Sequence, residues 1–186
     1  MADETLDEHD NADGTGLVRV WPSRRLVDLL NMQPDDFKLD DIAHALARQC
    51  RYNGHVDGFI SVAEHCVRVS KRIAAEGGSQ MEQACGLMHD AAEAYTGDLV
   101  GPLKHMPGME MFAQIEANIE SALFAAYELP YPMPPIVKRA DRAEGEEERN
   151  PVGGLRVRTL EFQRTFDEDK DAFLYLAGFF GLRDWS

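Results

Sequence analysis

Apolar residues recur mostly at intervals of three and four along this chain, the spacing typical of amphipathic helices packed on a common core. Such stripes predict helices over residues 40–52, 61–76, 79–95, 111–126, 135–144 and 155–178. A different pattern between Leu17 and Leu30 predicts a small β-hairpin, with Pro22-Ser23 at its turn. The fold expected from the pattern is therefore all-α with a minor N-terminal β element.

Several helix ends carry recognisable signals. Asp40 is expected to cap the first helix, and Ser61 with Glu64 and Ser79 with Glu82 form the spacing of two capping boxes. Glycine or proline is expected to end or begin several of these helices, and residues 97–108 and 145–154 are expected to form loops. The inward stripe predicted for helix 111–126 consists of Met111, Phe112, Ile115, Ile119, Leu123 and Ala126.

The chain has 186 residues, which suits one domain with a substantial core. Residues 1–14 are rich in aspartate and glutamate and poor in apolar side chains, so they are expected to form a flexible acidic leader. A single domain is expected over residues 15–186. Its aromatic end, with Phe179, Phe180 and Trp185, is expected to dock on the domain or to mediate assembly.

Composition favours a protein of the cytoplasm. The apolar share is 44%, but no apolar run reaches the roughly 20 residues that a membrane span needs, and the acidic N-terminus does not resemble a signal peptide. The three cysteines, Cys50, Cys66 and Cys85, form no CxxC pair and lie among apolar residues. Buried free thiols in a reducing compartment are therefore expected.

The net charge of −14 argues against stable binding to nucleic acid, which requires a basic surface. It leaves room for a small anionic substrate, because such a substrate needs only a few local cations and a metal ion.

The residues His89, Asp90 and Glu93 form a candidate site. On one helix these positions share a side, and the surrounding alanines and Met88 predict that this side is buried. Burying one imidazole with two carboxylates is unfavourable unless a cation compensates them. Taken alone, the triplet fits a hydrogen-bonded core histidine beside solvated acids equally well.

A metal site needs further ligands, and His65 and Asp141 are candidates because each borders an apolar helix face. Each is also compatible with a purely structural position. Two imidazoles and two carboxylates with open positions suit a six-coordinate divalent metal better than a structural zinc site, which favours four closed ligands. Glu93 could then orient or deprotonate water.

Possible substrate contacts surround this set. Arg51 suits phosphate recognition, Tyr52 could stack on a base, Asp98 could accept a hydrogen bond from a sugar hydroxyl, and Lys104 could balance phosphate charge. The alternative for each is an ordinary position in a surface loop or turn.

The order of these motifs resembles the HD-domain phosphohydrolases, and most closely the bacterial 5′-deoxynucleotidases and small phage-type enzymes that include a dATP triphosphohydrolase. The resemblance covers residues 42–144. The motifs that carry it are Ser61-Val62-Ala63-Glu64-His65, His89-Asp90-Ala91-Ala92-Glu93, Thr96-Gly97-Asp98-Leu99 leading to Lys104, and Lys138-Arg139-Ala140-Asp141.

The resemblance implies an α-helical HD bundle, assembled as a dimer or hexamer, and a role for each motif residue. The metal ligands would be His65, His89, Asp90 and Asp141, holding Mn, Co, Ni, Fe, Mg or Zn. The implied catalytic residues are Glu93, which would activate water, and Arg51, which would contact phosphate. The implied substrate-binding residues are Tyr52, His55, Asp98 and Lys104.

By this resemblance the chain is expected to hydrolyse a deoxynucleotide at the α-phosphorus, in the cytoplasm or in a host's cytoplasm if a phage encodes it. Either a monophosphate or a triphosphate is a possible substrate. The acidic residues after Asp141 put an extra basic pocket for a long polyphosphate in doubt. The alternative is an inactive HD domain that binds nucleotides or a protein partner.

Overall fold

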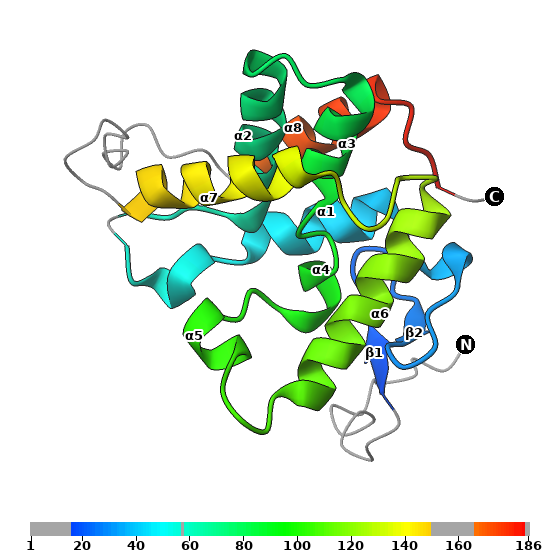
Figure 1. Cartoon of the computed structure of the whole chain (residues 1–186). Coiled ribbons are helices and arrows are strands. Elements are labelled where there is room, and N and C mark those ends of the chain that lie inside the picture. Colours follow the sequence, from blue (N-terminus) through cyan, green and yellow to red (C-terminus); the bar gives the residue numbers. More distant parts are fainter. Residues whose placement is uncertain (1–15, 57, 150–165, 185–186) are drawn as a thin grey trace.

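The computed structural model describes residues 16–56, 58–149 and 166–184 (Figure 1). Its strands and helices are β1 (Leu17–Arg19), β2 (Leu26–Asp28), α1 (Leu39–Arg48), α2 (Val62–Ala75), α3 (Gln80–Met88), α4 (Glu93–Thr96), α5 (Gly101–Lys104), α6 (Glu110–Ala126), α7 (Pro135–Arg149) and α8 (Phe166–Phe179). Short 3₁₀ turns lie at Pro34–Asp36 and Arg51–Gly54. The expected all-α fold with a small N-terminal hairpin is confirmed.

Helix α2 lies at the centre of the bundle and packs against α1, α3, α7 and α8. Its buried residues include Val62, Cys66, Val69 and Ile73, which form the apolar stripe that the three-and-four spacing predicts. In the view of Figure 1, α7 runs across the bundle below α2, and α4 and α5 lie below α7. Helix α2 is therefore the element around which residues distant in sequence are brought together.

The hairpin pairs β1 and β2 antiparallel, with Val18 opposite Val27. Its turn is held to α1 by Asp41, whose carboxylate accepts hydrogen bonds from the Ser23 backbone N–H at 2.8 Å and the Ser23 hydroxyl at 2.6 Å. The predicted hairpin is thus confirmed.

Ser61 and Ser79 are the N-caps of α2 and α3, as predicted, and the complete capping box is found at Ser79. The Ser61 side chain accepts a hydrogen bond from the Glu64 N–H, and Ser79 and Glu82 form a reciprocal capping box. The prediction for Asp40 is wrong, because α1 begins after Lys38 and Asp40 lies within its first turn. There the Asp40 carboxylate pairs with Lys170 at 2.7 Å and links α1 to α8.

The helix expected over residues 79–95 is interrupted. Helix α3 ends at Met88, and α4 begins only at Glu93. Between them the chain tightens, since Ala91 N–H donates to Met88 O and Glu93 N–H donates to Asp90 O, three residues back rather than four. The apolar pattern continues through this turn, which is why periodicity alone does not reveal it.

Other expectations fail or fall outside the described residues. Helix α7 continues through Gly145 to Arg149, in place of the loop expected from residue 145. Met111 does not lie on the inward face of α6 as predicted: its side chain is 71% exposed, because the first turns of α6 project beyond the core that Ile119 and Leu123 enter. The acidic leader, residues 155–165 and Trp185 lie outside the described residues.

The three cysteines are free thiols, as expected. Cys66 and Cys85 are buried and Cys50 is half-buried. Among the described residues, none of the helices is both long enough and apolar enough to cross a membrane.

Candidate functional site

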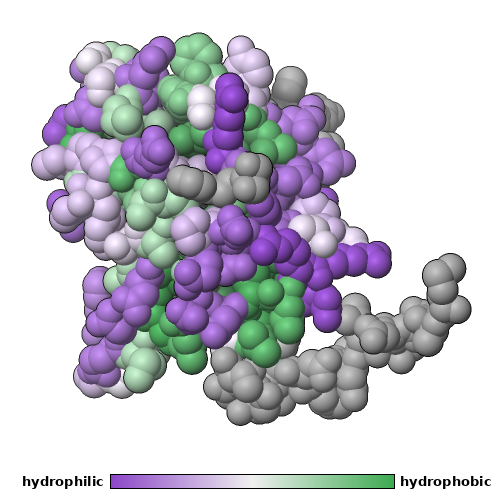
Figure 2. Space-filling model, turned by 90° about the vertical axis from the view of Figure 1, so that its right-hand side faces the viewer, coloured by the Kyte–Doolittle hydropathy of each residue, from purple (hydrophilic) through white to green (hydrophobic). Residues whose placement is uncertain are grey.

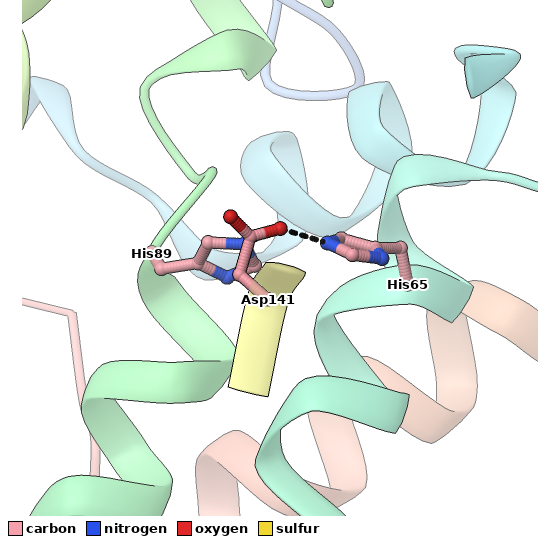
Figure 3. A group of neighbouring side chains, drawn as sticks. All are labelled: His65, His89 and Asp141. Atoms are coloured by element: carbon pink, nitrogen blue, oxygen red, sulfur yellow. Dashed lines mark hydrogen bonds and ion pairs between the residues drawn. The ribbon is translucent and has the colours of Figure 1, made fainter. Parts of the chain in front are cut away.

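Three separate segments meet at one buried point (Figure 3). His65 comes from α2, His89 from the end of α3, and Asp141 from α7. Helices α2 and α3 approach closely at Gly86, where an added Cβ would lie 2.5 Å from the Cδ1 atom of Ile73. The two imidazole rings lie with their centroids 5.2 Å apart.

Asp90 completes a group of four side chains whose polar atoms face one another. Asp141 Oδ1 lies 3.1 Å from His65 Nε2 and 3.8 Å from His89 Nε2. Asp90 Oδ2 lies 3.1 Å from His89 Nε2 and 3.8 Å from His65 Nε2. The tightened turn after α3 is what brings His89 and Asp90 to the same point.

These separations fit the ligand shell of a divalent metal ion. Two ligand atoms about 2.1 Å from one ion are about 3.0 Å apart at a right angle and about 3.4 Å apart at a tetrahedral angle. Two of the four observed distances, at 3.1 Å, lie between those values, and the other two, at 3.8 Å, are slightly longer. His65, His89 and Asp141 form one group able to hold an ion, and Cys66, His89 and Asp90 form another.

The hydrogen bonds of the two imidazoles leave the correct nitrogens for a metal. His89 Nδ1 lies 2.9 Å from Gly86 O, and a carbonyl only accepts, so Nδ1 carries the proton. His65 Nδ1 lies 2.8 Å from Glu148 Oε1 and donates to that carboxylate. His89 Nε2 is buried and makes no hydrogen bond among the described residues. Outer partners of this kind orient metal-binding histidines in known sites.

The charges of the cluster call for a compensating cation. Burial opposes ionisation of His89, yet Asp90 and Asp141 raise its pKa well above the usual value. For Asp90, burial favours the neutral carboxyl, but His89, His65 and Arg51 hold its pKa well below its usual range. Two carboxylates are thus kept ionised around two imidazoles, which suits a proton or a metal ion at the centre.

Glu93 lies beside this cluster and is held by Lys104. Lys104 Nζ bridges Glu93 Oε1 at 3.0 Å and Glu116 Oε1 at 2.8 Å. Burial, together with Asp90 and Asp98, raises the pKa of Glu93 to about 9 despite that lysine. The other oxygen, Oε2, is buried without a hydrogen-bond partner among the described residues. Glu93 is therefore held through one oxygen, while the other makes no hydrogen bond to the described residues.

A pocket of about 770 Å³ opens over the cluster. Its walls come from the Arg51–Gly54 turn, the α4–α5 segment and α7. Among the candidate site residues, those that line it are Arg51, Tyr52, His55, Asp90, Glu93, Asp98, Lys104 and Asp141. The volume suits a small organic ligand.

Arg51 and Tyr52 form one wall of the pocket, and acidic residues hold the Arg51 side chain in place. Arg51 Nε donates to Glu148 Oε2 at 3.0 Å, and Arg51 Nη1 lies 3.4 Å from Asp90 Oδ2. The centroid of the Tyr52 ring lies 5.1 Å from the guanidinium carbon of Arg51 and 5.5 Å from that of Arg149. This wall therefore combines positive charge with an aromatic face.

The structure also identifies residues in and around the pocket that the sequence did not indicate. Glu148 lies two helical turns after Asp141, but the expected end of the helix at residue 144 concealed their shared face. Gln49 joins the two walls, because its side chain donates to Glu93 O at 2.9 Å and accepts from Asp98 N–H at 3.2 Å. Arg149 and Arg142 line the pocket from α7. An i, i+7 spacing of acids on one helix was the signal for Glu148.

Comparison with known proteins places this chain in a family. It is 34% identical over 134 residues to the uncharacterized protein RCAP_rcc00048 of Rhodobacter capsulatus, a match covering 68% of each chain. It is 36% identical over 119 residues to the uncharacterized protein YfdR of Escherichia coli, covering 64% of this chain and 63% of YfdR. The chain belongs to the family of the Rhodobacter protein. No protein-family model matches it.

Proposed function

We propose that this chain is a metal-dependent phosphohydrolase of the HD-domain type that acts on nucleotides. The observation that carries the proposal is the cluster of His65, His89, Asp90 and Asp141, of which Asp90 and Asp141 line a pocket. Two imidazoles and two carboxylates form a ligand set for a divalent ion such as Mn, Co, Ni, Fe, Mg or Zn. An ion held there would supply Lewis-acid activation of a phosphoryl oxygen and of water.

The remaining pocket residues match the needs of phosphate-ester hydrolysis. The Glu93 carboxylate would accept a proton from the attacking water, and its buried Oε2 atom supports that role. Arg51 and Lys104 would balance the phosphate charge. The Tyr52 ring would stack on the base, Asp98 would bind a sugar hydroxyl, and the exposed His55 would line the entrance.

In the proposed reaction, water attacks the α-phosphorus and the bond from that phosphorus to the 5′-oxygen of the sugar breaks. The 5′-oxygen takes up a proton and leaves as the nucleoside hydroxyl. A deoxynucleoside monophosphate would yield phosphate, and a triphosphate would yield triphosphate. Both substrates present the same reacting atoms to the cluster, so both belong to the proposal.

The test is a product-release assay over all deoxynucleoside mono- and triphosphates, with Mn, Co and Mg supplied separately and with chelator-treated protein as the blank. Phosphate or triphosphate should appear with at least one nucleotide, and only with metal. Asp90→Ala should abolish turnover, whereas Glu147→Ala, on the outer face of α7, should leave it unchanged. A wild-type protein that retains no metal and turns over no nucleotide would contradict the proposal.

We further propose that the protein works in the cytoplasm as a homo-oligomer, a dimer or a hexamer. Large apolar side chains support assembly, since Met111, Tyr175 and Phe179 are 71%, 74% and 60% exposed. Figure 2 shows hydrophobic groups interspersed with hydrophilic ones on one face of the molecule. Light scattering in solution should give a mass that is a multiple of 20.8 kDa, and a mass of one chain would contradict assembly.

A further inference from the structure

Glu148 lies beneath both halves of the site and contacts each of them. Its side chain is fully buried on α7. Oε1 accepts from His65 Nδ1 at 2.8 Å, while Oε2 accepts from Arg51 Nε at 3.0 Å and from the Tyr52 hydroxyl at 2.8 Å. One carboxylate therefore joins a candidate metal ligand to the positively charged wall of the pocket.

We infer that Glu148 is the positioning residue that couples the metal site to the substrate wall, an inference that rests on the proposed function. By accepting the Nδ1 proton of His65, it directs the other ring nitrogen, Nε2, at Asp90 and Asp141, where that atom would bind the metal. By binding Arg51 and Tyr52 at the same time, it fixes where phosphate and base would meet that metal.

The conformation of the wall shows why it needs such a partner. Tyr52 has φ 57° and Asn53 has φ 52°, so two consecutive residues other than glycine adopt the left-handed region. The Tyr52 hydroxyl is anchored by Glu148, with Gly145 O a further 3.4 Å contact. Holding this disfavoured backbone in place is what keeps the Arg51 guanidinium over Asp90.

The hydrogen bonds of Glu148 agree with an ionised acceptor. The two oxygens of Glu148 together accept three hydrogen bonds, from His65, Arg51 and Tyr52. A charge buried at this depth persists only when its hydrogen bonds are complete. Glutamine cannot replace this glutamate. The side-chain NH₂ group of glutamine is a donor, and it would face another donor, either His65 Nδ1 or the Arg51 and Tyr52 groups.

Glu144 provides a matched control. It is a buried glutamate one turn earlier on α7, and its carboxylate binds Arg72 rather than any residue of the site. Replacing it therefore also removes a buried ion pair of the same helix, but leaves His65, Arg51 and Tyr52 untouched. An effect seen only at Glu148 cannot come from α7 stability alone.

The experiment measures the affinity of Zn²⁺ by chelator competition for wild type, Glu148→Gln and Glu144→Gln, after circular dichroism has established that each is folded. We expect Glu148→Gln to bind zinc about 10- to 100-fold more weakly. Glu144→Gln should keep a zinc affinity within about twofold of wild type, because Glu144 contacts no candidate metal ligand. Equal affinity for wild type and Glu148→Gln would overturn the inference, as would an equal loss in Glu144→Gln.

A second measurement uses the wild-type protein and does not depend on a variant folding. Nitrogen-15 NMR of the zinc-loaded protein should show the His65 Nδ1 atom protonated and the Nε2 atom bound to metal. The reverse assignment would overturn the inference. Absence of nucleotide turnover would refute the proposed function but leave both binding results standing, so the two failures are distinguishable.

Discussion

Glu93 is a buried carboxyl whose ionisation is disfavoured both by burial and by two neighbouring carboxylates. Its pKa is raised to about 9 by burial and by Asp90 and Asp98, whereas the unfolded chain has the ordinary value near 4.5. A folded-state pKa above the unfolded one means that ionising Glu93 destabilises the fold. This penalty is absent below about pH 4.5 and grows as the pH rises towards 9.

We therefore expect metal-free Glu93→Gln to be more stable than metal-free wild type at pH 8, and the difference to shrink at pH 5. Urea unfolding of both proteins at the two pH values measures it. The same pair measured with saturating metal is the control, because a nearby cation stabilises the carboxylate. A difference that is equal at both pH values, or that is larger at pH 5, would show that Glu93 is not the titrating group.

A second prediction distinguishes the role of Asp90 as a candidate metal ligand from that of Glu93 as the proposed general base. Asp90→Ala should lose both metal and activity, because it removes an oxygen that lies 3.1 Å from His89 Nε2. Glu93→Ala should keep the metal and lose rate by about 10²- to 10⁴-fold, the range for a general acid or base. Metal content after purification and initial rates give both quantities. Loss of metal from Glu93→Ala would make Glu93 a ligand instead.

For the helices and strands, features that depend on nearby residues were predicted correctly, and features that depend on tertiary packing were not. The hairpin, the Ser79 capping box and the start of α7 at Pro135 follow from nearby residues, and all are found. The interruption between α3 and α4 was not predictable, because apolar spacing is the same in a helix and in a tight turn that continues its direction. The continuation of α7 past Gly145 depends on its packing against α2 and α3.

The loop after α4 offers a prediction at this scale. Gly97 has φ 82° and ψ 152°, a region that is essentially restricted to glycine. We expect Gly97→Ala to destabilise the protein by roughly 1–3 kcal/mol and to raise KM, since it would displace Asp98. No atom lies within 4 Å of the added Cβ, so backbone strain is the only cause.

Gly101→Ala is the control for that change. Gly101 also has open space where the added methyl group would lie, but it has an ordinary backbone conformation within α5. Thermal unfolding of the two variants should differ accordingly. If Gly97→Ala unfolds at the same temperature as Gly101→Ala, the strained conformation of the loop is not required.

At the scale of the whole molecule, only the packing of distant helices brings the candidate ligands together. His65 and Asp141 are 76 residues apart in sequence, yet their polar atoms lie 3.1 Å apart. Sequence order and the family resemblance named these residues, but their distances, the role of Gly86 and the partners of Glu148 depend on how α2, α3 and α7 pack. No local pattern contains that information.

Because the ligands come from α2, the turn after α3, and α7, metal binding should stabilise the bundle as a unit. An ion at 100 times its Kd adds about 2.7 kcal/mol to the free energy of unfolding, provided the unfolded chain does not bind it. For a chain of this size that corresponds to a rise in Tm of about 5–11 °C. Differential scanning calorimetry of chelator-treated protein, before and after addition of Mn²⁺ or Zn²⁺, measures the shift.

Asp141→Asn should lose most of this rise in Tm, whereas Asp171→Asn, an exposed change on α8, should retain it. An unchanged Tm in the wild type, or an equal shift in Asp141→Asn, would mean that these four side chains do not bind the ion together.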